Sequence, residues 1–228
     1  MLEPCAAMIA MIHPFRPWLA ILLTLLAVGP ARAVDGVPAS RTIQFEIVRQ
    51  GSVIGRHRIN FSEQGERLTV DIDVAVKVDV AFITVYRFTH RAREVWEGGR
   101  LVAMTATSND DGAPHELAIE LRDGAFAVTH NGAASRLPAG LVPTSLWNPA
   151  TLKQTVLLDS VDGDTMPTPV TPLGKSTIDT PAGPVTADGF LVDARPDFAR
   201  RVWYSPAGTL IAVSLTAQDG SEVLYRLR

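Results

Sequence analysis

The stretch that decides the fold is LTVDIDVAVKVDV, residues 68–80. Every even position in it carries leucine, isoleucine or valine, while the odd positions carry polar, charged or small residues. A β-strand sends alternate side chains to opposite faces, whereas a helix would scatter these apolar residues around its circumference. Branching at Cβ in most of them favours the same extended conformation. The stretch therefore predicts a strand with one apolar and one polar face.

The same alternation continues on both sides of this stretch, and turn-forming residues separate the runs. Asp-Gly pairs at 111–112, 123–124 and 219–220 are strong signals for β-hairpins. The alternating runs are 42–47, 53–61, 82–96, 101–107, 116–121, 125–130, 185–192, 201–205, 210–216 and 222–227. Short strands joined in sequence order predict an all-β, mainly antiparallel fold. We expect a single large, highly curved meander sheet, or a partly open barrel, of about a dozen strands.

Helical signals are confined to one place in the chain. Asn148-Pro149 is typical of an N-cap followed by proline in the first turn, and it predicts a short helix near 148–158. Residues 159–184 contain five prolines, which predict irregular edge strands and loops.

The junction around Ala81 contains no glycine, proline or asparagine. A single strand from 68 to 96 would be about 95 Å long, so the chain must turn or bend sharply there. If it turns and both apolar faces coincide, the connecting loop must have an odd length. The aspartates of the first strand would then lie on the same face as the arginines of the second.

The first 33 residues predict export. Residues 18–28, WLAILLTLLAV, form an uncharged apolar run that is too short to span a bilayer and is typical of a signal peptide. Ala31-Arg-Ala33 follows as a cleavage site. We therefore expect a signal peptide at 1–33, a polar leader at 34–40 and a single antiparallel β domain at 41–228. The periplasm of a Gram-negative bacterium is the expected location.

Composition excludes several classes of function. The 228 residues include 21 basic and 24 acidic side chains, and the resulting net charge of −3 argues against nucleic-acid binding. The single cysteine, Cys5, precedes the apolar run, so the processed domain has neither a disulfide nor a cysteine metal site. Zinc-type histidine spacing, glycine-rich nucleotide motifs and a GxSxG elbow are missing from the sequence. No catalytic residue, metal or cofactor is predicted, and an enzyme is disfavoured.

Charged side chains on the odd positions have two interpretations. Asp71 and Asp73 resemble the carboxylate pair of a glycosidase, which would make the protein a hydrolase. A solvated strand face with arginines on the neighbouring strand explains them more simply. Those arginines, Arg87, Arg91 and Arg93, form the basic cluster of the sequence and are the candidates for contact with an anionic partner.

Large aromatic side chains are the candidates for contact with an apolar ligand. Core packing is the simpler explanation for each of them, but a highly curved sheet often encloses a cavity. Trp147 lies between strands beside the helix start, where a plug or lid at an open mouth would lie. The candidate ligand-binding residues are Trp147, Trp96, Phe82, Tyr86, Phe88 and Trp203.

Several pieces of the sequence occur in a recognisable order. They are Glu94-Val-Trp96-Glu-Gly98, Thr107-Ser-Asn-Asp-Asp-Gly112, Ser145-Leu-Trp147-Asn148, Trp203-Tyr204 and Asp219-Gly220-Ser. From about Arg41 to the C-terminus, the chain resembles an uncharacterised exported bacterial family classed as a domain of unknown function. More distantly, the strand pattern is similar to LolA/LolB-like lipoprotein-localisation half-barrels, which wrap a curved sheet around helices and hold acyl chains. That second likeness implies a fold and little about function.

Three hypotheses for function remain. The first is a non-catalytic periplasmic module that binds or carries an apolar or amphipathic ligand, such as a lipid, on the concave face of the sheet. The alternative is an interaction or scaffolding module of the cell envelope, which recognises a protein through its polar face or an open sheet edge. The third is the hydrolase that uses a carboxylate pair.

Overall fold

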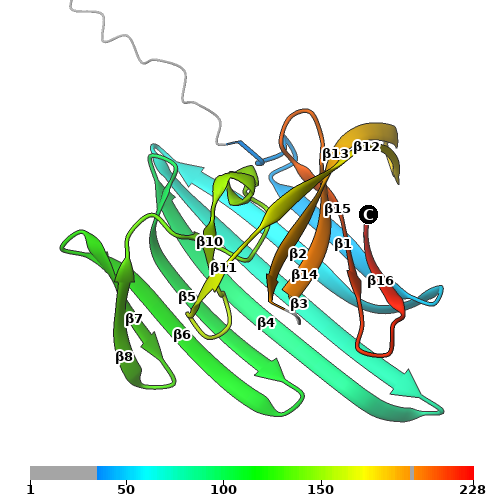
Figure 1. The fold of residues 1–228 in the computed structure, drawn as a ribbon, viewed down its shortest axis with the longest axis horizontal. Helices are drawn as coiled ribbons and strands as arrows, with labels where there is room; N and C mark the ends of the chain where they lie inside the picture. Colours follow the sequence, from blue (N-terminus) through cyan, green and yellow to red (C-terminus); the bar gives the residue numbers. More distant parts are fainter. Residues whose placement is uncertain (1–34, 196–197) are drawn as a thin grey trace, which may run out of the picture. The chain divides into compact units, whose positions relative to one another are not determined.

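A computed structural model describes residues 35–195 and 198–228, and this part of the chain is built almost entirely of β-strands (Figure 1). The predicted signal peptide at 1–33 lies outside the described residues. The elements are β1 Thr42–Arg49, β2 Ser52–Gln64, β3 Arg67–Val80, β4 Ile83–Glu97, β5 Arg100–Asp110, β6 Ala113–Arg122, β7 Ala125–His130, β8 Ala133–Pro138, β9 Val142–Pro143, η1 Pro149–Lys153, β10 Val156–Leu158, β11 Thr165–Pro167, β12 Val170–Thr180, β13 Gly183–Arg195, β14 Phe198–Tyr204, β15 Leu210–Thr216 and β16 Glu222–Leu227. The all-β prediction is confirmed.

One antiparallel sheet contains 13 of these strands, in the order β12-β13-β14-β15-β16-β1-β2-β3-β4-β5-β6-β7-β8. Sequential hairpins build both halves, as the meander prediction requires. The pairing of β16 with β1 joins these two halves, one of five strands and one of eight, inside the sheet. The sheet does not close on itself, because β8 and β12 are its two edges. The predicted large, open, meander-like sheet is therefore confirmed.

Residues 139–169 connect the two edge strands, β8 and β12, and pack against the apolar face of the sheet. We call this segment the strap. It contains η1 and a second, three-stranded sheet in the order β11-β10-β9. Its apolar side chains belong to the same core as those of the large sheet. The buried ones include Val142, Leu146, Trp147, Leu157, Leu158 and Met166. The face that would hold a ligand in an empty half-barrel is thus covered by the chain itself.

The predicted helix is shorter than expected and of a tighter type. Asn148 caps it as predicted, since its side chain accepts a hydrogen bond from the Ala150 N–H. The helix is a single 3-10 turn that ends at Lys153, and β10 begins at Val156. The prediction of a helix reaching residue 158 was wrong, because the apolar residues after the turn pair as a strand with β11 and β9.

The chain turns at Ala81 and Phe82, which form a two-residue loop between β3 and β4. The predicted odd loop length was wrong. A β-bulge between Val78 and Asp79 supplies the odd offset instead, so Val78 lies opposite Tyr86. A bulge adds one residue to one strand and thereby restores the alignment of the two faces.

Candidate functional site

Trp147, the predicted lid residue, lies in the core. Its side chain is fully buried, and its ring contacts Phe61 and Trp96 edge-on, with centroids 5.2 and 5.5 Å away. The indole N–H groups of Trp147 and Trp96 both donate to Glu94 Oε2, at 2.8 and 2.9 Å. This network binds the strap to β4 near the end of that strand, and Trp147 therefore lies in the core and not at a solvent-exposed rim.

Glu94 is fully buried, although it is the one acid on the apolar face of β4. Burial raises the pKa of its carboxyl above the usual 4.5, while hydrogen bonds from Trp147, Ser145 and Trp96 oppose that rise. Its second oxygen, Oε1, has no hydrogen-bond partner among the described residues. Glu94 was not among the residues predicted from the sequence. Its even position within the alternation of β4 was the available signal.

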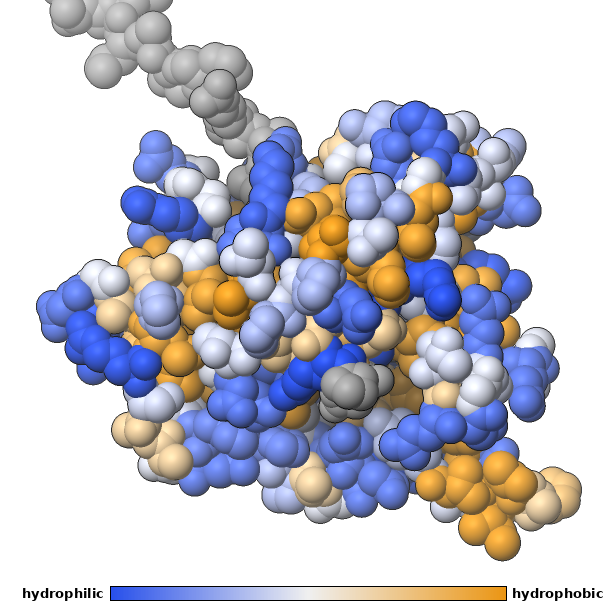
Figure 2. Space-filling view, in the orientation of Figure 1, coloured by the Kyte–Doolittle hydropathy of each residue, from blue (hydrophilic) through white to orange (hydrophobic). Residues whose placement is uncertain are grey.

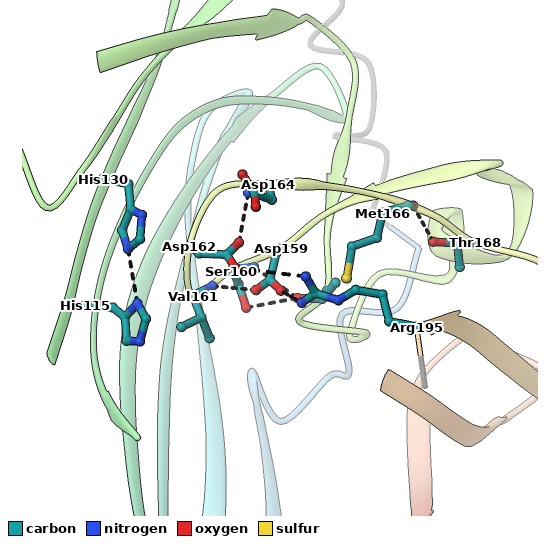
Figure 3. A network of polar contacts seen from close by, with 11 residues as sticks. His115, His130, Asp159, Ser160, Val161, Asp162, Asp164, Met166, Thr168 and Arg195 are labelled. Carbon is teal, nitrogen blue, oxygen red and sulfur yellow. Dashed lines mark hydrogen bonds and ion pairs between the residues drawn. The ribbon is translucent and has the colours of Figure 1, made fainter. Parts of the chain in front are cut away.

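Two further contacts hold the strap against the other half of the sheet. The Tyr204 hydroxyl of β14 donates to the Leu146 carbonyl at 2.6 Å. Arg195 of β13 forms an ion pair with Asp159, whose carboxylate also accepts from the Val161 N–H (Figure 3). The strap is therefore fastened to both halves of the sheet.

A stacked histidine pair lies in the same view, with His115 Nδ1 3.1 Å from His130 Nε2 (Figure 3). In residues 35–195 and 198–228, no group of three or more His, Cys, Asp or Glu side chains is arranged to hold a metal ion.

The end of the β3–β4 hairpin is a protruding apolar cluster, which we call the apolar tip. Phe82 is as exposed as in an extended peptide, at 104%, and Ile83 is 68% exposed. The tip consists of Val80, Phe82, Ile83, Val85 and Tyr86. Figure 2 shows it as an orange cluster at lower right. Two sequence-predicted candidates, Phe82 and Tyr86, belong to it.

The turn that carries the tip has an unfavourable backbone. Ala81 and Phe82 have φ angles of 47° and 70°, in the left-handed region. Two-residue hairpin loops of this kind normally use Asn-Gly or Asp-Gly, and each non-glycine residue there costs about 1–2 kcal/mol. Most other hairpins in this chain follow that preference, with glycine at positive φ in turns such as Asp111-Gly112 and Asp123-Gly124. The β3–β4 turn thus places a phenylalanine in solvent at a cost in stability.

The arginines predicted to meet an anionic partner divide into two groups. Arg93 donates to Asp71 at 2.7 Å, and Arg91 donates to Asp73 at 3.1 Å. These cross-strand pairs line a shallow hollow of about 410 Å³ on the polar face. Since the two aspartates pair with arginines, this hollow is balanced in charge.

Arg87 belongs to a different hollow on the polar side of β1 to β4, which we call the basic recess. Its volume is about 460 Å³. Its charged lining residues are Arg56, Arg58, Lys77, Arg87, Arg228 and Glu46. Only Arg87 was predicted from sequence. Of the other four cations, Arg56 and Arg58 lie on β2, Lys77 lies on β3 and Arg228 follows β16, so they become neighbours only through the strand order β16-β1-β2-β3.

The remaining predicted aromatic residues lie apart from the tip. Phe88 is half-buried and stacks on His90, with ring centroids 6.3 Å apart. Trp203 is half-buried on β14, and its indole nitrogen fits over Gly189, where a Cβ would lie 2.8 Å away. The structure therefore brings Trp96 and Trp147 together in the core and Phe82 and Tyr86 together at the tip, while Trp203 lies in the other half of the sheet.

Comparison with known families identifies the family of this chain. Residues 45–228 match the family described as Domain of unknown function (DUF6134). The chain belongs to this family. The predicted resemblance to a family of unknown function is confirmed. This match does not concern export, which stays a prediction. No curated protein matches the sequence.

The DUF6134 domain is also similar in fold to a solved structure. This is the crystal structure of a β-barrel-like protein of domain of unknown function DUF1849 from Brucella abortus, with a TM-score of 0.61 and 12% identity. The match covers 82% of this chain and 94% of that chain. This match supports a distant similarity in fold to β-barrel-like proteins. At 12% identity, it concerns the fold alone.

Proposed function

We propose that the DUF6134 domain is an exported, periplasmic, non-catalytic module that binds lipid at a membrane surface through its apolar tip. The exposure of Phe82 and Ile83 at the end of the longest hairpin carries this proposal. Soluble domains rarely present several large apolar side chains together unless the patch meets a partner or a membrane. The strained turn supports the same proposal, since it exposes Phe82 where glycine would be more stable.

Because the strap covers the apolar face of the sheet, we propose that lipid contacts the apolar tip and not the concave face on which it was expected. A ligand on the apolar face would have to displace Trp147 and break its hydrogen bond to Glu94. The tip needs no such rearrangement. The signal peptide expected at residues 1–33 supports delivery of the domain to a compartment bounded by membranes. Within residues 35–195 and 198–228, no helix is long and apolar enough to cross a bilayer.

The tip is suited to reversible attachment. Ala81 is four positions beyond Lys77 in the chain, so the apolar end of the hairpin projects about 13 Å beyond the cross-strand pair of Lys77 and Arg87. Interfacial segments insert about 5–10 Å into the boundary between headgroups and acyl chains. Full burial of a large apolar side chain is worth about 1.5–3 kcal/mol. A few such side chains give binding comparable with a single lipid anchor, which is reversible.

Vesicle co-sedimentation tests the proposal with the processed protein and phosphatidylcholine vesicles. Removing both side chains in the Phe82→Ser/Ile83→Ser double variant should lower partitioning about tenfold or more. Leu173→Ser is the matched control, because Leu173 is an exposed leucine on edge strand β12, away from the tip. It should bind as the wild type does.

Circular dichroism and thermal unfolding establish that each variant is folded. Absence of binding by the wild type to any vesicle would refute the proposal. Equal binding by the wild type and the double variant would refute it too. Capture of a soluble envelope protein by the tip, without vesicle binding, would favour the interaction module instead.

A further inference from the structure

The basic recess lies behind the apolar tip on the polar face of the same hairpin. Lys77 of β3 and Arg87 of β4 are direct cross-strand partners, and both line the recess. The turn at Ala81 is four residues, or about 13 Å, beyond Lys77. When the tip enters the outer part of a bilayer, these two cations therefore reach the depth of the lipid phosphates.

Charge in the recess is strongly one-sided. Five cations line it, and Glu46 is the single carboxylate among its lining residues. Arg58 and Arg87 are exposed, and neither forms a salt bridge with a described carboxylate. The acids nearby are already in use, since Asp73 contacts Arg91 and Arg56, and Asp79 contacts Lys77.

Other groups around the recess do not cancel this charge. His57 lies in its floor, where burial lowers its pKa to about 3, so the ring is neutral at physiological pH. Glu46 already contacts Arg226 and Arg228. Asp110 accepts a hydrogen bond from the Tyr86 hydroxyl on the neighbouring side of the hairpin. Arg58 and Arg87, which form no salt bridge with a described carboxylate, remain available to an incoming anion, while the charge of Arg87 also lowers the pKa of Asp79.

The backbone of the recess is tightly fixed. Gly55 of β2 faces β3 so closely that a Cβ there would lie 2.3 Å from the Ala75 carbonyl oxygen. Only glycine permits this approach, which sets Arg56 opposite Ala75 and Arg58 opposite Asp73, in the same lining as Lys77 and Arg87. Arginine presents a planar set of donors that matches phosphate oxygens in pairs, which is why it recurs in phosphate sites.

We propose that the basic recess binds the phosphate headgroups of anionic phospholipids and gives the membrane-bound domain a preference for negatively charged bilayers. This inference rests on the proposed membrane attachment, and it assigns the partner of the recess. The apolar tip supplies binding to any bilayer, and the recess supplies the discrimination by charge.

The test compares two vesicle compositions: phosphatidylcholine alone, and equal parts of phosphatidylcholine and phosphatidylglycerol. Wild-type protein should bind the anionic vesicles more strongly at low salt and lose that preference as salt increases. The Arg58→Gln/Arg87→Gln variant should lose about fivefold in binding to anionic vesicles for each arginine removed, with binding to neutral vesicles unchanged.

Arg93→Gln is the matched control for the recess variant. It removes a cation from the same polar face, but from the balanced hollow in which Arg93 pairs with Asp71. It should preserve the preference for anionic vesicles. A soluble arm with glycerol phosphate, measured by calorimetry, separates a lipid headgroup from a free phosphate. We expect no saturable binding in that arm.

The outcomes separate this inference from the proposed function. Equal binding of the wild type to neutral and anionic vesicles would refute the recess assignment and leave tip insertion intact. A loss in Arg93→Gln equal to the loss per arginine in the recess variant would refute it too, because the effect would then follow net charge alone. Saturable binding of glycerol phosphate would replace the lipid surface by a soluble ligand. Loss of all vesicle binding in the tip variant supports the proposed function independently.

Discussion

Replacement of Glu94 tests whether the strap is held by a buried carboxylate. In Glu94→Ala, the indole N–H groups of Trp96 and Trp147 lose their acceptor while both rings remain buried. A buried donor without a partner costs about 1–3 kcal/mol, so the two together should destabilise the fold by about 2–6 kcal/mol. In Glu94→Gln, an amide oxygen still accepts from the indoles, and the loss should be about 1–2 kcal/mol.

The pH dependence of the same variants gives a second check. Because burial raises the pKa of Glu94, the folded protein holds this proton more tightly than the unfolded chain. The resulting stability is present in acid and is lost as the pH rises from about 4.5 through the folded pKa. Glu94→Gln cannot ionise, so its stability relative to the wild type should improve as the pH rises from 4.5 toward neutrality.

Urea unfolding followed by tryptophan fluorescence measures both effects, since Trp96 and Trp147 lie at the site. A loss below about 1 kcal/mol in Glu94→Ala would show that the indole groups find other acceptors. A Glu94→Gln variant as unstable as Glu94→Ala would refute the assignment of the carboxylate as an acceptor. Either result would remove Glu94 as the attachment point of the strap.

Two further predictions concern stability. Burial lowers the pKa of His57 to about 3 and of His90 to about 4. The stability that these neutral histidines contribute is therefore complete above pH 6.5 and is lost as the pH falls below that value. His57→Phe should reduce this loss by about 1.4 kcal/mol per pH unit below pH 6, measured by urea unfolding; an unchanged slope would contradict the buried, neutral state. Ala81→Asn/Phe82→Gly should raise the free energy of unfolding by about 1–3 kcal/mol, because it relieves two left-handed residues. A decrease in that free energy would show that the apolar tip stabilises the fold, and the variant should also fail to bind vesicles.

The sequence predicts the strands well because alternation is a local property. The valines of 68–80 fix their own faces without reference to any distant residue, and the result is β3 with an apolar and a polar side. The cross-strand pairs of Asp71 with Arg93 and of Asp73 with Arg91 follow from the same alternation once β3 and β4 form a hairpin. The simpler interpretation of these charges as a paired, solvated face agrees with the geometry.

Features that depend on distant segments were not predictable in this way. The strap covers the apolar face through contacts between Trp147 and residues of β2 and β4, and nothing in its local pattern specifies that destination. The basic recess requires the register of four strands. The tip left one usable signal. A hairpin turn that has no glycine, proline or asparagine and lies within the mainly apolar stretch 80–86 is unusual, and it indicates that these apolar side chains are exposed for a function.

The pairing of β16 with β1 has a consequence for how the domain folds. Arg226 and Glu46, which form an ion pair across these strands, are 180 residues apart in the chain. The two hairpin series can form from near neighbours at the speed of local contacts, but their union must close this long loop and should be the slow step. Loss of the last six or seven residues would therefore remove an interior strand, separate β12–β15 from β1–β8 and leave β15 and β1 without their partner, instead of trimming an edge.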